Sequence, residues 1–353
     1  MIAFRADGNK DIGMGHLMRC ICIAENLVQS GNEVIFIVSP DSDTQIIAQH
    51  NLRVIQMKSA GPLGWNLQEL TETIGRYHVN VLIVDSYRTT RSDFAELRTH
   101  TKVIYLDDLY TFDAKVDVVI NCNIDSKAEP YERSNIMDRK VYTGVDYFPL
   151  RKEFDGYKNG SIRREVSTVL ITTGSTDPFH CTAQIVEALP VTRYPNVMFV
   201  ILLGKYYPGA YVDKLKLYCT RYKNVIFAPW GGNIAKLISE SDILISSGSS
   251  TVLEALSLGV PCITFQFAEN HKTECEELDR REMAPWAGIY DSNQSKDTNR
   301  KLRELFKVEL DYEIRKRQYD AFSRCFDGNG LQRIVDIINQ TNAPKQIRVC
   351  KWQ

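Results

Sequence analysis

The stretch IAFRADGNKDIGMGHLMR, residues 2–19, joins a short apolar run to a glycine-containing turn and then to the start of an amphipathic segment. The run Ile2–Ala6 is typical of a buried strand, and the pattern over Gly15–Gln29 predicts a helix. Gly13 and Gly15 let the backbone turn tightly between the two elements and approach a ligand closely. A strand that leads through a loop into a helix is the building unit of a parallel α/β sheet.

The same alternation of short β-branched runs and longer helical patterns continues through the chain. Because the polar stretch Asp155–Arg164 interrupts it, we predict an α/β chain of two doubly wound Rossmann-like domains, residues 1–155 and 156–353, that face a central cleft. The tail is helical in pattern, and its last helix can either stay with the second domain or pack back on the first. Further strands are predicted at residues 33–38, 81–85, 102–106, 118–120, 168–172, 197–203, 225–228, 243–246 and 261–265.

The bulk composition is that of a globular chain, since 44% of the 353 residues are hydrophobic and 25% are charged. A net charge of −1 provides no basic field that would attract nucleic acid. No apolar run reaches the roughly 18–20 residues that a membrane span needs, and no signal peptide is recognisable at the start. The nine cysteines are scattered without a Cys-x-x-Cys pair, which favours reduced thiols over disulfides or a zinc site. We therefore expect a cytoplasmic protein without a membrane partner.

His16 is predicted to lie in the first helical turn after the glycine-containing loop. The positive end of the helix dipole disfavours protonation there, so an unbonded imidazole is expected to be neutral at pH 7 and able to accept a proton. Arg19, one turn later, can reach an anionic ligand. Met18 stands where the dinucleotide fingerprint needs glycine, so NAD is not expected, nor any other cofactor. The alternative is an ordinary glycine-rich turn with a surface histidine.

A second cluster, Ser246–Glu254, follows a predicted strand and begins a helix. Free backbone N–H groups, the helix dipole and side-chain hydroxyls form an anion site that suits a diphosphate, while Glu254 can accept both hydroxyls of a ribose. A plain helix cap accounts for the same residues, and the lysine of a Walker loop is absent. A loop after the preceding strand can cup a flat base. The candidate nucleotide-binding residues are Asn233, Ile234, Gly248, Ser249, Ser250, Thr251 and Glu254.

Further polar residues follow the predicted strands and are expected to face the cleft. Asp85 and Tyr87 follow one strand, and the pair Asp107-Asp108 follows the next. Adjacent carboxylates on one loop are weak evidence for Mg²⁺, so no metal is predicted, and each aspartate could instead cap a turn. In the second domain, Gly174–Thr176 and Asn270 occupy similar positions.

In their order and spacing these clusters resemble the UDP-sugar hydrolases of pseudaminic acid biosynthesis and their spore-coat polysaccharide relatives. The second half is also similar to the nucleotide-binding half of the lipid II-forming N-acetylglucosaminyltransferase. The residues that carry the first resemblance are Phe4–Asp7, Ile12–His16 with Arg19, Asp85–Tyr87, Leu106–Asp108, Gly144, Tyr147, Leu150-Arg151, Glu153-Phe154, Thr176–Pro178, Ser249–Glu254, Glu269-Asn270, Asp327-Gly328, Gly330 and Arg333.

The resemblance implies a GT-B fold, a first domain that binds the sugar, a second that binds UDP, and metal-independent, inverting attack by water. It makes His16 the general base and Tyr87 an active-site tyrosine. Ser175 and His271 depart from the family pattern, as does the segment Met283–Ala287, which leaves the sugar open. A glycosyltransferase and a non-catalytic nucleotide-sugar-binding protein remain alternatives, and the oligomeric state is not indicated. The implied substrate contacts are Arg5, Asp7, Gly13, Gly15, Arg19, Asp85, Asp107, Arg151, Gly174, Thr176 and Asn270.

Overall fold

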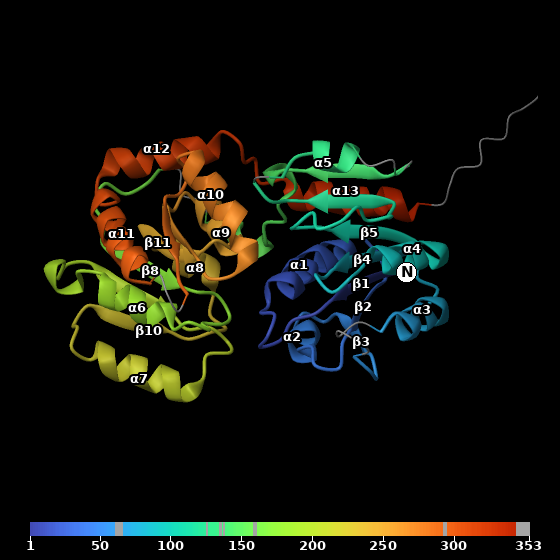
Figure 1. Cartoon of the computed structure of the whole chain (residues 1–353), viewed down its shortest axis with the longest axis horizontal. Helices are drawn as coiled ribbons and strands as arrows, with labels where there is room; N and C mark the ends of the chain where they lie inside the picture. Colours follow the sequence, from blue (N-terminus) through green and yellow to red (C-terminus); the bar gives the residue numbers. More distant parts are fainter. Residues whose placement is uncertain are drawn as a thin grey trace, which may run out of the picture.

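The structure, a computed structural model, describes residues 1–60, 66–124, 126–133, 136, 138–157, 161–291 and 295–343. Within these residues two parallel sheets form two domains that lie side by side (Figure 1). The first sheet has the order β3-β2-β1-β4-β5-β6-β7. Its strands are β1 (Ile2–Ala6), β2 (Val34–Val38), β3 (Arg53–Gln56), β4 (Val81–Asp85), β5 (Lys102–Leu106), β6 (Val118–Asn121) and β7 (Lys140–Thr143).

The second sheet has the order β10-β9-β8-β11-β12-β13. Its strands are β8 (Thr168–Thr172), β9 (Met198–Leu202), β10 (Val225–Ala228), β11 (Ile243–Ser247), β12 (Cys262–Gln266) and β13 (Trp286–Ile289). The sequence-based prediction of an α/β chain with two doubly wound domains is confirmed. The predicted boundary after residue 155 falls in the segment between β7 and β8.

Helices cover both faces of each sheet. The first domain holds α1 (Gly15–Gln29), α2 (Thr44–Gln49), α3 (Leu67–Arg76), α4 (Arg91–His100) and α5 (Glu129–Glu132). The second holds α6 (Cys181–Ala188), α7 (Gly209–Cys219), α8 (Ile234–Ser239), α9 (Ser250–Ser257), α10 (Lys272–Arg280), α11 (Ser295–Val308) and α12 (Tyr312–Ser323). In these described parts of the chain, no helix is both long and apolar enough to cross a membrane.

The strand order reverses beside the first strand of each sheet. β1 lies between β2 and β4, and β8 lies between β9 and β11. β1 and β4 also end together, because Ala6 is paired with Asp85. Open α/β sheets hold their ligands at this kind of reversal, outside the carboxyl ends of the strands. The loops that follow β1, β4, β8 and β11 are therefore placed where a ligand would bind.

Three strands were not predicted from the sequence: β3, β7 and β13. Each is an edge strand of four residues, and most of its residues are only half-buried or exposed. Strands in the middle of a parallel sheet are covered on both faces, so they carry continuous apolar runs such as VIFIV in β2. These three edge strands lack that pattern and were missed, whereas the fourth edge strand, β10, was predicted from its run VIFA.

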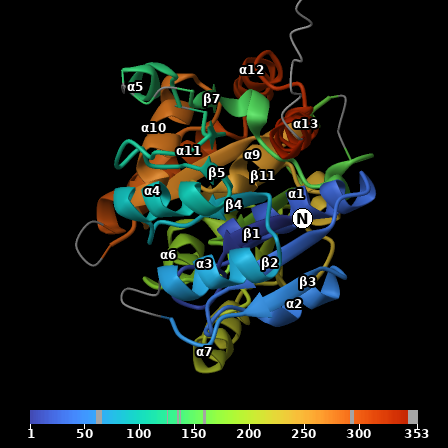
Figure 2. The ribbon, with the colours of Figure 1, turned by 90° about the vertical axis from the view of Figure 1, so that its right-hand side faces the viewer.

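The last described helix, α13 (Gly330–Asn342), returns to the first domain, where it lies beside β5 (Figures 1 and 2). Its apolar residues, among them Ile334 and Ile338, join the core that α1 forms with β1. The side chain of Asn32 donates a hydrogen bond to Asn339 at 3.0 Å. The chain thus passes between the domains twice, once after β7 and once after α12.

Gly330, the first residue of α13, lies against the backbone of Phe148 in the first of these crossings. A Cβ at this position would lie 2.6 Å from the Phe148 nitrogen. We therefore expect Gly330→Ala to lower the free energy of unfolding by about 1–3 kcal/mol, as overpacking does. Gly75→Ala in α3, where nothing lies within 4 Å of the added Cβ, is the matched control and should be neutral or stabilising. Urea unfolding of both variants measures the difference, and equal midpoints would contradict it.

Candidate active site at the ends of β1, β4 and β5

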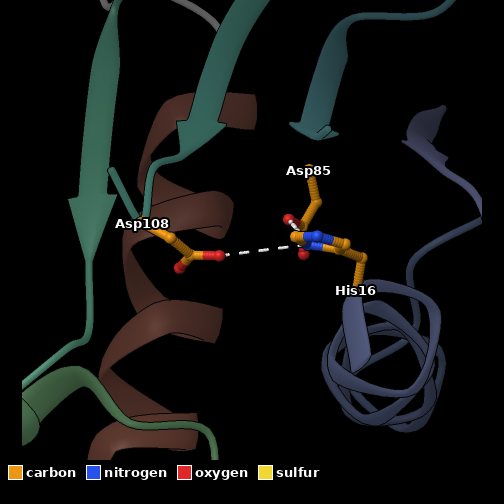
Figure 3. Close-up of side chains that lie close together, drawn as sticks. All are labelled: His16, Asp85 and Asp108. Atoms are coloured by element: carbon orange, nitrogen blue, oxygen red, sulfur yellow. Dashed lines mark hydrogen bonds and ion pairs between the residues drawn. The ribbon is translucent and has the colours of Figure 1, made fainter. Parts of the chain in front are cut away.

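His16 and Asp85 form a hydrogen-bonded pair at the switch point of the first sheet. His16 is the second residue of α1 and Asp85 is the last residue of β4. Because β1 and β4 are neighbours, the helix that follows β1 begins beside the end of β4. The Nδ1 atom of His16 lies 2.6 Å from Oδ1 of Asp85 (Figure 3). The side chain of His16 keeps 14% of its surface exposed, whereas Asp85 is buried.

Arg19 joins this pair to a second carboxylate. Its Nε and Nη2 atoms donate to Asp85 at 2.9 and 2.7 Å. Its Nη1 and Nη2 atoms donate to Asp108 at 2.7 and 3.1 Å. Arg19 lies one helical turn after His16, so both side chains leave the same face of α1. The guanidinium therefore lies between two carboxylates and offsets their mutual repulsion.

Tyr87 completes the cluster. Its hydroxyl donates to Oδ2 of Asp108 at 2.9 Å, and its ring meets the His16 imidazole edge-on with 4.5 Å between centroids. The side chain is 46% exposed, so it also faces outward from the cluster. Burial and the Asp108 carboxylate raise the pKa of Tyr87 above its usual value of 10. The hydroxyl is therefore a hydrogen-bond donor at neutral pH rather than a base.

The carboxylates determine the charge state of His16. Burial alone would lower the pKa of the imidazole, but the Asp85 carboxylate outweighs it, so the pKa is raised above the usual value of 6.5. Burial likewise opposes the charge of Asp85, yet Arg19 and His16 lower the pKa of that carboxyl. The expectation of a neutral imidazole applied to an unbonded histidine; here Asp85 accepts a hydrogen bond from Nδ1, which favours the protonated form. Nε2, which has no hydrogen-bond partner within the described ranges, is left to accept a proton from a ligand.

Ligand atoms of His16, Asp85 and Asp108 lie within 4.8 Å of one another and form the one such group of His, Cys and acidic residues in the described part of the chain. Asp108 Oδ2 is 3.9 Å from His16 Nδ1 (Figure 3). Arg19, however, already binds both carboxylates. A divalent cation would have to displace this guanidinium, so the donor set fits a charge-neutralising arginine better than a metal.

Three predicted substrate contacts of the first domain have other partners. Arg5 donates to Asp7 and to the Ser39 hydroxyl, each at 2.7 Å, and Asp7 accepts the Ser39 N–H at 2.7 Å. This buried network ties β1 to the loop after β2. Asp107 accepts the Tyr131 hydroxyl at 2.8 Å and caps the following turn, so its neighbour Asp108 joins the His16 cluster instead. The sequence signal was the adjacent pair, which does not say which carboxylate points inward.

The predicted nucleotide cluster of the second domain lies at the β11–α9 turn. Ser249 precedes α9, and its side chain makes no capping hydrogen bond, while Ser250 and Thr251 form the first helical turn. A Cβ at Gly248 would lie 3.0 Å from the carbonyl oxygen of His271, so only glycine fits without displacement. The N–H groups of Gly248 and Ser249 donate to the carbonyls of Phe265 and Ser247, so the N–H groups of Ser250 and Thr251 at the helix start are the candidate anion donors.

Glu254 and Arg151 are paired across the domains. Arg151 Nε and Nη2 donate to the two carboxylate oxygens at 2.8 and 3.0 Å, and Arg151 also pairs with Glu153. Two carboxylate oxygens carry about four acceptor sites, so the bidentate arginine leaves room for two hydroxyl donors. Arg151 was predicted to contact substrate; here it holds Glu254, the residue predicted to bind the ribose. The two residues are 103 positions apart in the sequence, so no local pattern reveals their contact.

The other predicted residues of the second domain lie on loops at the carboxyl ends of its strands. Asn233 caps α8 by accepting the Lys236 N–H at 2.8 Å, and Ile234 begins that helix. Asn270 is half-buried in the turn after β12. Gly174, with φ +87°, and Thr176 flank Ser175, whose hydroxyl lies 3.2 Å from a Cβ placed on Gly13. The loop before His16 therefore meets the loop after β8.

Comparison with known proteins finds a family match within the second half of the chain and relatives along most of its length. Residues 168–278 match the family model of the glycosyltransferase family 28 C-terminal domain. A Campylobacter jejuni protein, UDP-2,4-diacetamido-2,4,6-trideoxy-beta-L-altropyranose hydrolase, is 27% identical over 81% of this chain and 95% of its own. The Bacillus subtilis spore coat polysaccharide biosynthesis protein SpsG is 21% identical over 94% of this chain and 96% of its own. Uncharacterized protein MJ1062 of Methanocaldococcus jannaschii is 26% identical over 78% of this chain, and the matched part covers 57% of that protein.

Among solved structures, Acinetobacter baumannii MurG superimposes with a TM-score of 0.65 and 16% identity, over 96% of this chain and 99% of that one. The rhamnosyltransferase SpnG gives a TM-score of 0.66 at 15% identity. The chain has the GT-B fold. In this GT-B chain, the His16 cluster and the β11–α9 turn occupy corresponding positions of the two domains, since each lies at the carboxyl ends of strands beside the switch point of its sheet.

Proposed function

We propose that this GT-B protein is an enzyme that hydrolyses a UDP-sugar, releasing a 2,4-diacetamido-2,4,6-trideoxyhexose and UDP, in nonulosonic acid or surface polysaccharide biosynthesis. The observation that carries the proposal is the His16–Asp85 pair, with Nε2 of the imidazole left open. The likeness to the Campylobacter jejuni hydrolase over 81% of the chain supports the substrate class. The UDP moiety is assigned to the β11–α9 turn and the sugar to the first domain.

In the proposed reaction, Asp85 holds the Nδ1 proton of His16, so Nε2 takes a proton from a water molecule. The water oxygen forms a bond to the anomeric carbon from the side opposite UDP. The bond between that carbon and the phosphate oxygen breaks, and its electron pair leaves with UDP, which inverts the anomeric configuration. The N–H groups of the β11–α9 turn stabilise the departing diphosphate.

A glycosyltransferase is the second candidate, because residues 168–278 match a glycosyltransferase domain. Both reactions use the same nucleotide domain, so the acceptor separates them. The experiment is incubation of the protein with a panel of UDP-sugars and no acceptor, with UDP and free sugar followed by NMR. Release of free sugar as the inverted anomer supports the hydrolase. UDP-sugar consumption only after an acceptor is added supports the transferase, and stoichiometric binding without turnover refutes both.

The rate should depend on pH through His16. A general base must be neutral, and the pKa of His16 is raised above 6.5, so kcat is expected to fall as the pH drops through this raised value. The effect on stability has the opposite sign. A pKa that is higher in the folded protein than in the unfolded chain stabilises the fold, and this stabilisation is fully present at a pH below the pKa of the unfolded chain. It is lost as the pH rises through the pKa of the folded protein. A pH–rate profile from pH 5 to 9, with thermal unfolding at each pH as control, measures both. A rate that is flat across this range would contradict the assignment of His16.

A further inference from the structure

A contact between the two domains lies beside the loop that carries His16 but outside the reacting groups. Asp43 precedes α2 in the first domain, whereas Lys205 and Tyr206 follow β9 in the second. Lys205 Nζ forms an ion pair with Asp43 Oδ2, and the Tyr206 hydroxyl donates to the same oxygen at 3.1 Å. The Asp43 and Lys205 side chains are 15% and 25% exposed, so water only partly screens the pair.

Tyr206 also reaches the loop that leads into α1. Its hydroxyl lies 3.2 Å from the Met14 sulfur, and Met14 is two residues before His16. The backbone N–H of Tyr206 donates to the Ser175 carbonyl at 2.9 Å, and Ser175 in turn lies against Gly13. One tyrosine therefore connects the loop after β1 with the loops after β8 and β9.

The position of this contact suits a closing device. The two chain crossings lie together, since Phe148 of the first packs against Phe326 and Gly330 of the second. In Figure 1 these crossings lie at the upper edge of the molecule, near α12 and α13, whereas α2 lies at the lower edge, and Figure 2 agrees. Covalent connections at one edge and a polar contact at the other are the arrangement of a hinge with a clasp.

We propose that Asp43, Lys205 and Tyr206 form an interdomain clasp and are positioning residues that hold the loop Asn9–Met14, and with it His16, against the second domain when nucleotide is bound. The inference rests on the proposed function for its kinetic consequence and for the binding of UDP. None of the three residues contacts His16, Asp85 or Asp108 in a described hydrogen bond. They act through the position of the loop.

The test removes the charges without removing the side chains. Asp43→Asn keeps a side chain that can cap α2, and Lys205→Met keeps the length of the lysine. Each variant is expected to raise KM for the UDP-sugar about five-fold, and the double variant no more than either alone, because residues of one contact are not additive. Asp213→Asn and Lys214→Met on the exposed face of α7 are the matched controls.

Hydrogen exchange of the amides of residues 9–14, measured with and without UDP, reports the clasp independently of turnover. UDP should slow this exchange in the wild type and in the α7 controls, and about five-fold less in Asp43→Asn, Lys205→Met and Tyr206→Phe. This result stands even for a protein that hydrolyses no UDP-sugar, so failure of the proposed function is distinguishable. UDP-dependent protection equal to wild type in all three variants would overturn the clasp. So would a double variant whose increase in KM is the product of the increases in Asp43→Asn and Lys205→Met.

Discussion

His16→Ala is expected to lower kcat for UDP-sugar hydrolysis by about 10²–10⁴-fold, the usual contribution of a general base. The imidazole of His16 is held by Asp85 through Nδ1, and Nε2 is the atom left to accept a proton. Removing it leaves the β11–α9 turn intact, so UDP should bind with unchanged affinity. Steady-state kinetics and calorimetric titration with UDP measure the two effects separately.

His100→Ala is the matched control for His16→Ala, because His100 is an exposed histidine at the end of α4 that pairs with Glu96. It should leave both kcat and UDP affinity unchanged. Added imidazole should restore part of the activity of His16→Ala if the lost group is a base. Wild-type turnover in His16→Ala, or loss of UDP binding together with activity, would refute the assignment.

Local patterns in the sequence predicted much of this architecture. Apolar runs marked the central strands, and Gly13 and Gly15 marked the turn into α1, so His16 could be placed at a helix start from residues 2–19 alone. The β11–α9 turn was found by the same reasoning, from small hydroxyl residues after an apolar run. Such features depend on neighbours in sequence, which is why sequence reasoning reaches them.

Contacts between distant residues were beyond that reasoning. Asp85 was placed at a strand end, but its hydrogen bond to His16 spans 69 residues and depends on which strand lies next to β1. Asp107 and Asp108 were equivalent in sequence, and the turn after β5 determines that only Asp108 reaches Arg19. The interdomain contact of Asp43, Lys205 and Tyr206 was not predicted, because an ion pair between loops of two domains leaves no local sequence pattern.

Asp85→Asn is expected to lower kcat by about 10²–10³-fold, although Asn has almost the same size as Asp. The carboxylate of Asp85 can only accept a hydrogen bond, so it fixes the Nδ1 proton of His16 and leaves Nε2 unprotonated. The amide of Asn can instead donate to Nδ1, which favours the tautomer that carries its proton on Nε2. In that tautomer Nε2 cannot act as a base. Kinetics with the preferred UDP-sugar measures the loss.

The pH profile of Asp85→Asn separates this electrostatic role from a structural one. Asp85 raises the pKa of His16 against the lowering effect of burial, so its removal should shift the acid limb of the residual activity to lower pH. Asp108→Asn is the matched control, because Asp108 pairs with Arg19 but lies 3.9 Å from Nδ1. It should cost less activity and shift the limb less in the same direction. An acid limb in Asp85→Asn that stays at the wild-type pH would show that Asp85 acts only through Arg19 and the fold of the site.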